Sequence, residues 1–151
     1  MTRALIAVGA ALALMVAGLG LAVYLGRDKD NIQVDNALSE DFTRDVQLAE
    51  ARQADVDVRE LAPFDWASAL VVAPGTPRAT ISRRLGYEWI GRQGLETDAA
   101  IVILLDDSGK VVRFFEYRGQ GRFEGLRTPI AQLPRDRAVF RVTDLVITPK
   151  G

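Results

Sequence analysis

The chain has 151 residues, a net charge of −1, and neither cysteine nor histidine. These absences exclude disulfides, thiol chemistry, histidine general bases and histidine-ligated zinc, and the net negative charge argues against nucleic-acid binding. The charge is uneven: residues 28–65 hold 11 acids and 4 bases, whereas residues 66–151 hold 9 acids and 13 bases. We expect either that these two parts attract each other or that one faces a charged partner.

A run of 22 residues without charge, Ala4 to Leu25, stands near the start of the chain. A helix of that length just crosses a bilayer core of roughly 30 Å, so the run predicts a retained transmembrane anchor. A cleaved signal and a buried soluble helix are the alternatives. The very short segment that precedes the run favours a cytoplasmic N-terminus. We therefore expect an anchor over 1–26, a juxtamembrane linker over 27–37 and an extracytoplasmic domain over 38–151.

The first part of the domain is predicted to contain two helices, one strand and one ambiguous segment. Apolar residues recur at helical spacing over residues 40–53, and Ser39 has the side chain of an N-cap. Residues 55–61 alternate like a short strand but are also compatible with a continued helix. Residues 64–73 predict a strand. A helix is predicted over 77–85, with Thr76 as N-cap, Pro77 at the first helical position and Gly86 at its end.

The middle of the domain predicts a β-hairpin. Residues 98–106 contain a continuous apolar run that is typical of a buried strand, residues 107–109 form a turn signal, and residues 110–117 predict the returning strand. Five side chains of this hairpin are expected in the core: Ile101, Ile103, Leu105, Val112 and Phe114.

The last third of the chain predicts less order. Residues 118–134 are expected to be an irregular excursion, and residues 138–148 a single final strand. Together these elements predict an α+β domain in which about two helices pack on one face of an antiparallel sheet of three to five strands.

Residues 81–86, Ile-Ser-Arg-Arg-Leu-Gly, follow Gly75-Thr76 and together resemble the helix motif of small bacterial envelope domains of the SmpA/OmlA type. The resemblance covers about 12 residues. This chain departs from the motif because it has no lipid-bearing cysteine and because Thr76 lies one residue too far from Ile81. The resemblance implies two helices on a three-stranded antiparallel sheet and an accessory, binding role in outer-membrane assembly.

Four weak patterns could carry chemistry, and each has an ordinary structural explanation. They are an acidic turn that could hold a cation, a glycine pair that could hold phosphate, two tryptophans that could form a ligand platform, and a carboxylate pair that could serve a glycosidase-like reaction. Their residues are Asp106 and Asp107, Gly119 and Gly121, Trp66 and Trp89, and Asp65 and Glu88. We predict no catalytic, cofactor or metal site from them.

An arginine cluster is the strongest candidate site. It comprises four arginines with two interleaved aromatic residues: Arg113, Tyr117, Arg118, Arg122, Phe123 and Arg127. Guanidinium groups bind carboxylates and phosphates in bidentate geometry. We expect these arginines to be exposed and mostly unpaired if they serve a partner. If they are structural, we expect them to pair with Asp41, Asp45 or Glu50; a merely solvated loop is the third possibility.

These observations favour a non-catalytic protein-interaction or envelope-maintenance module, anchored in the cytoplasmic membrane, whose partner is an envelope protein or another anionic molecule. An envelope hydrolase or transferase that uses carboxylates and arginines is one alternative. A sensor that dimerises through its anchor is another, because small residues recur at helical spacing in the apolar run.

Overall fold

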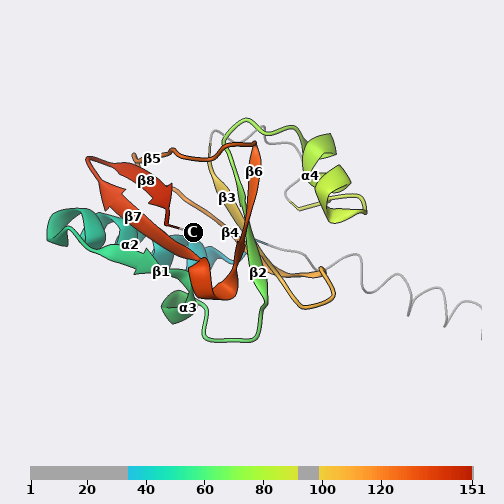
Figure 1. Cartoon of the computed structure of the whole chain (residues 1–151), viewed down its shortest axis with the longest axis horizontal. Coiled ribbons are helices and arrows are strands. Elements are labelled where there is room, and N and C mark those ends of the chain that lie inside the picture. Colours follow the sequence, from blue (N-terminus) through green and yellow to red (C-terminus); the bar gives the residue numbers. More distant parts are fainter. Residues whose placement is uncertain (1–33, 92–98, 151) are drawn as a thin grey trace, which may run out of the picture. The chain divides into compact units, whose positions relative to one another are not determined.

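The computed structural model describes residues 34–91 and 99–150, all of which belong to one compact unit. It is a mixed α+β fold (Figure 1). Along the chain the described elements are α2 (Asn36–Arg52), β1 (Asp55–Asp57), α3 (Val58–Leu61), β2 (Ser68–Val72), α4 (Arg78–Leu85), β3 (Ile101–Leu105), β4 (Val111–Glu116), β5 (Arg122–Phe123), β6 (Ile130–Pro134), the 3-10 helix η1 (Arg135–Arg137), β7 (Val139–Thr143) and β8 (Val146–Pro149).

The strands form two four-stranded sheets rather than the single sheet predicted from the sequence. The central sheet has the order β4-β3-β2-β6 and is antiparallel throughout. The small sheet has the order β1-β7-β8-β5, and its β5–β8 pair is parallel. In Figure 1 the small sheet and α2 lie to one side of the central sheet, and α4 lies to the other.

Both faces of the central sheet are buried, which explains the continuous apolar run of β3. Successive side chains of a strand point to opposite faces. Val102 and Leu104 accordingly join the larger core cluster with α2 and the small sheet, whereas Ile103 and Leu105 join a second cluster with α4. The predicted core residues Ile103, Leu105 and Phe114 are confirmed as buried, and Ile101 is half-buried.

Helix α2 confirms the predicted helix but begins earlier, inside the segment predicted as linker. Its N-cap is Asp35, whose side chain accepts from the Leu38 amide at 3.0 Å. The predicted cap, Ser39, is fully buried. Its hydroxyl donates to the Asp35 carbonyl (2.8 Å) and accepts from the Glu116 amide (3.1 Å), so this side chain fastens the helix to β4.

In the ambiguous segment 55–61 the strand alternative is confirmed for residues 55–57, whereas residues 58–61 form a separate helix and do not continue α2. Strand β1 pairs with β7, and the chain then turns directly into α3. Asp57 caps that helix by accepting from the Arg59 amide at 2.9 Å.

Helix α4 confirms the helix predicted after residue 76, with a different start. Pro77 is the N-cap, and the Thr76 hydroxyl instead donates to the Ala73 carbonyl at 2.6 Å. Gly86 ends the helix as predicted, with a left-handed φ of 81° that glycine adopts without steric cost.

The β3–β4 hairpin is confirmed, with one side chain in a different place. The Asp106 carboxylate closes the turn by accepting from the Ser108 amide (2.8 Å) and the Lys110 amide (2.9 Å). A bulge shifts the register where Leu104 opposes Arg113 and Leu105 opposes Val111. Val112 is therefore the extra residue and is 39% exposed, so its predicted place in the core is wrong.

The C-terminal third is more ordered than predicted. The supposed irregular excursion contains β5 and β6, and β6 pairs with β2 along its whole length. The supposed single last strand is the hairpin β7–β8. Its two-residue turn, Asp144 and Leu145, has φ values of 52° and 58°, as a type I′ turn requires.

Within residues 34–91 and 99–150, no helix has the length and apolar character needed to cross a bilayer. The predicted anchor, Ala4–Leu25, lies outside the described residues.

Candidate functional site

Arg113, the first arginine of the cluster, is engaged within the domain. Its guanidinium lies 2.8 Å from the Asp35 carboxylate. It also lies 4.4 Å from the centre of the Phe64 ring, within the range of a cation–π contact. Arg113 therefore links the start of α2 to the loop that precedes β2.

Arg118 and Arg122 also have partners. Arg118 donates to the Asn36 side chain at 2.6 Å and lies 3.6 Å from Glu116. Arg122 pairs with Glu124 at 2.6 Å. The expectation of mostly unpaired arginines is therefore wrong for three of the four.

The acids that were expected as structural partners contact other groups. Asp41 pairs with Arg44 at 2.6 Å, and Glu50 accepts from the Leu145 amide at 3.1 Å. The arginines instead contact acceptors at the start of α2 and acids two positions away in the sequence. The prediction that structural arginines pair with Asp41, Asp45 or Glu50 is therefore wrong.

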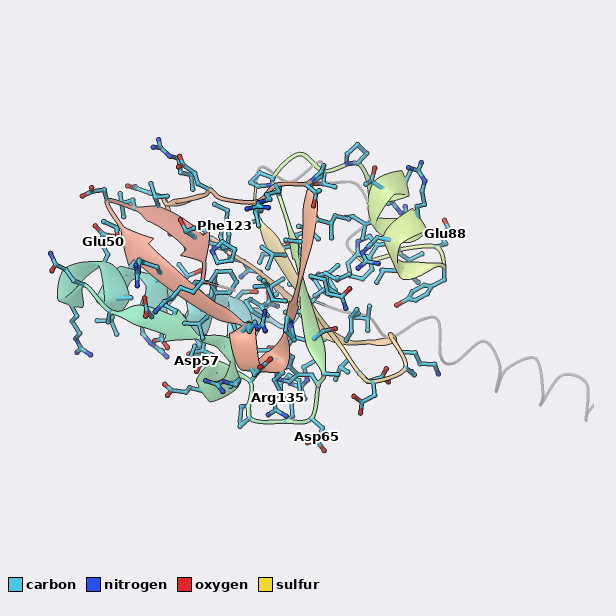
Figure 2. All side chains as sticks on the ribbon, in the orientation of Figure 1. Glu50, Asp57, Asp65, Glu88, Phe123 and Arg135 are labelled. Atoms are coloured by element: carbon cyan, nitrogen blue, oxygen red, sulfur yellow. The ribbon has the colours of Figure 1, made fainter. Side chains whose placement is uncertain are left out.

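The two aromatic members of the cluster contribute to the core. The Tyr117 ring is buried and packs edge-on against Phe42 and Phe123. Phe123 lies beside the β7–β8 hairpin in Figure 2, where it also contacts Phe140. Neither ring forms an exposed platform.

The glycines that follow Tyr117 allow the chain to pass close to the Tyr117 side chain. A Cβ at Gly119 would lie 2.3 Å from the Tyr117 hydroxyl oxygen, and the Gly121 amide donates to that oxygen at 3.0 Å. The loop closes around a tyrosine, which accounts for the glycine pair without a phosphate ligand.

Arg127 differs from the other three arginines. It is exposed, and no hydrogen bond or ion pair joins it to another residue within 34–91 and 99–150. It lines an open groove of about 440 Å³ between two loops. We call this feature the loop groove; its lining is Ala73, Pro74, Gly75, Thr76, Pro77, Phe123, Glu124, Gly125, Leu126, Arg127, Thr128 and Pro129.

The loop groove forms where β2 ends and β6 begins. The Ala73 amide donates to the Pro129 carbonyl at 2.8 Å, which ties the two loops together. Gly75 and Gly125 turn the two loops with φ values of 71° and 76°. A Cβ at Gly125 would lie 2.9 Å from the Thr148 side chain, so this loop runs close against β8.

The groove combines one available cation with apolar walls. Among the described residues that line the groove, Glu124 is the one acid, and Arg122 engages its carboxylate. Pro74, Pro77 and Leu126 supply apolar surface. Such a surface suits an anionic group, a carboxylate or a phosphate, that has an apolar neighbour.

The other candidate patterns are not assembled into sites. The two tryptophans belong to different core clusters, and Asp106 is used by the hairpin turn. In Figure 2 Glu88 lies beside α4 and Asp65 lies at the opposite end of β2. Among the described residues, no three side chains suited to metal binding gather.

Sequence reasoning found Arg127 and Phe123 but missed the loop at residues 73–77 as part of the same surface. The signal was the pair of glycine- and proline-containing loops, 73–77 and 125–129, although only strand pairing brings them together. No family model, curated protein or solved structure matches this chain.

Proposed function

We propose that the protein is a membrane-anchored, non-catalytic interaction module of the cell envelope, which captures an acidic segment of a partner protein at the loop groove. The observation that carries this proposal is Arg127, an exposed guanidinium without a partner among the described residues, set between apolar walls. The other three arginines of the cluster are paired within the domain.

The groove suits a weak, reversible interaction. An ion pair at a fully exposed site contributes only about 0–1 kcal/mol. A bidentate guanidinium–carboxylate pair that is partly shielded by Pro74 and Leu126 contributes more, about 1–2 kcal/mol, which corresponds to a roughly 5- to 30-fold change in affinity.

The location in the envelope rests on the sequence. The apolar run Ala4–Leu25 is long enough for an anchor, and the short segment before it favours a domain outside the cytoplasm. The resemblance of residues 75–86 to SmpA/OmlA-type envelope domains supports the same compartment and a binding role. A phosphatase reporter fused to the C-terminus should be active in cells, and an active cytoplasmic reporter at that position would contradict this topology.

Binding can be tested with the full-length chain in a mild detergent and a fluorescein-labelled hexaglutamate peptide. Fluorescence anisotropy should show binding that weakens as salt rises, because both partners are charged. Arg127→Ala should weaken it about 5- to 30-fold.

Arg44→Ala is the matched control, because it makes the same change in charge at an exposed arginine of α2 that pairs with Asp41 and does not line the groove. It should leave the affinity within about twofold, a free-energy difference below about 0.5 kcal/mol. An equal loss in both variants would show that the peptide responds only to net charge and would overturn the groove as the binding site.

A further inference from the structure

The outer edge of β6 has no strand beside it in the described part of the chain (Figure 1). Its backbone groups alternate between this edge and β2, as in any antiparallel pair. The Pro129 carbonyl accepts from Ala73 and the Arg135 amide donates to Ala67, so the odd-numbered residues between them also face β2. The even-numbered residues Ile130 and Gln132 therefore direct their backbone groups outward.

The open edge is short and has defined ends. The Thr128 hydroxyl donates to the Ile130 carbonyl at 2.7 Å and so occupies the first outward acceptor. Within residues 34–91 and 99–150, no hydrogen bond uses the Ile130 amide or either backbone group of Gln132, so these groups can pair with a further strand. Pro134 comes next in the outward series and has no amide hydrogen, so pairing stops there.

The opposite edge of the central sheet is closed by the chain itself. On β4, the Phe114 carbonyl accepts from the Asp35 amide at 2.8 Å. The Glu116 amide donates to Ser39, and the Arg118 amide just beyond the strand donates to Thr43. One edge is thus protected against pairing with other strands by α2, whereas the β6 edge keeps its pairing groups.

Arginine side chains surround the open edge, and their positive charge favours an acidic partner. Residues 125–135 contain Arg127 before β6 and Arg135 after it, and no acid. Figure 2 shows Arg135 at the η1 end of the strand, where its guanidinium lies 5.3 Å from the centre of the Trp66 ring. Arg84 of α4 reaches the strand from the side and donates to the Gln132 side chain.

We propose that β6 binds an extended acidic peptide as a fifth strand of the central sheet, with an acidic side chain of the peptide on Arg127. The groove and the edge are continuous, because Pro129 lines the groove and Ile130 begins the strand. Backbone pairing holds the peptide, and the flanking arginines select its charge. This inference rests on the proposed function, of which it specifies the partner and the binding mode.

The test uses the full-length chain in detergent and the synthetic peptide Glu-Thr-Val-Thr-Val-Glu, whose residues favour an extended strand. Amide hydrogen exchange is measured by NMR with and without saturating peptide. The Ile130 and Gln132 amides should become protected at least tenfold. Unchanged exchange at both amides would overturn strand addition. Protection that rises with protein concentration in the absence of peptide would also overturn it, since the occupant would then be a second copy of the chain.

A proline variant tests the same bond by affinity. Ile130→Pro removes an outward amide at an edge position, where proline is tolerated, and it should weaken peptide binding at least tenfold. Ile130→Val keeps the amide and should bind as the unmodified chain does. A thermal melt shows whether Ile130→Pro is folded; if it is not, the exchange measurement decides alone.

The two proposals fail in different ways. If Arg127→Ala weakens peptide binding whereas folded Ile130→Pro does not, the groove function stands and strand addition is overturned. If neither change affects binding, both proposals fail.

Discussion

The Asp35 carboxylate and the Arg113 guanidinium lie 2.8 Å apart although 78 positions separate them in the chain. Asp35 makes two further contacts at the same point. Its other carboxylate oxygen caps α2 by accepting from the Leu38 amide, and its backbone amide donates to the Phe114 carbonyl. Asp35 therefore caps α2 and joins the start of that helix to β4.

Replacing Asp35 should separate the cap from the ion pair. Asp35→Ala removes both and should lower the free energy of unfolding by about 1–3 kcal/mol. Asp35→Asn keeps a good capping side chain and loses only the charge, so it should cost about 1 kcal/mol or less. Urea unfolding of both variants measures the difference. Equal losses would contradict a capping role for this side chain.

The paired carboxylates of Asp35 and Asp55 should make the stability of the fold depend on pH in the acidic range. Burial raises the pKa of Asp35, but the Leu38 amide and Arg113 outweigh it and hold this pKa below its ordinary value of 3.8. The hydrogen bond from Lys150 is the largest cause that lowers the pKa of Asp55. A carboxyl with a lowered pKa stabilises the fold above its unfolded-state pKa, and this contribution is lost as the pH falls through the folded-state pKa.

Thermal melts between about pH 6 and about pH 2.5 test this linkage. The melting temperature of the unmodified chain should fall most steeply below about pH 3.8, and the Asp35→Asn/Asp55→Asn double variant should lose less over the same range. Asp107→Asn, which changes charge at the exposed hairpin turn, is the control and should follow the unmodified chain. Parallel curves for all three proteins would contradict the assignment.

Local sequence patterns are sufficient to predict the elements that bury one apolar helix face or one continuous apolar segment. The helical spacing of Phe42, Val46 and Ala49 predicted α2, and all three are buried. The apolar run of residues 101–105 with its acidic turn predicted the β3–β4 hairpin. The bulge that exposes Val112 depends on how two strands meet, so the alternation of the strand alone did not reveal it.

The missed strands depend on partners that are distant in sequence. Strand β6 has proline before and within it, and only its pairing with β2 defines it. The β7–β8 turn places Leu145 in a left-handed conformation that bulky residues rarely adopt, so the residue type gave no turn signal. Pairing of Arg113 with Asp35 was missed for the same reason: helix-periodicity arguments do not show which acid reaches across the domain.

In the loop groove, exposure alone does not identify the arginine that we propose for binding. Arg122 and Arg127 are both exposed and only five positions apart. Glu124, two residues from Arg122, pairs with Arg122, whereas no described residue pairs with Arg127. The distinction lies in side-chain geometry around the loop groove rather than in residue type.

Two hydrophobic residues of the hairpin should differ sharply in their effect on stability. Ile103 is fully buried, whereas Val112 is 39% exposed. Ile103→Ala should lower the free energy of unfolding by about 2–5 kcal/mol. Val112→Ala should change it by about 0.5 kcal/mol or less. Chemical unfolding measures both, and a large loss for Val112→Ala would place the bulge elsewhere in the strand.

Loss of the contact between Ser39 and β4 should lower the free energy of unfolding by more than one ordinary hydrogen bond contributes. Ser39→Ala removes the acceptor of the buried Glu116 amide, and burial without an acceptor costs about 1–3 kcal/mol. Thr43→Ala is the matched control, because Thr43 accepts from the Arg118 amide at an exposed position where water replaces it. Both changes introduce alanine into α2, so the gain in helix propensity largely cancels in the comparison.

Urea unfolding should therefore show a loss for Ser39→Ala that exceeds the loss for Thr43→Ala by about 1–2 kcal/mol. Amide exchange adds a local measurement, since protection of the Glu116 amide should fall in Ser39→Ala and remain in Thr43→Ala. If the two variants unfold at the same urea concentration, the hydroxyl of Ser39 is not what closes this edge of the central sheet. Closure would then rest on the Asp35 amide and the packing of α2 against β4.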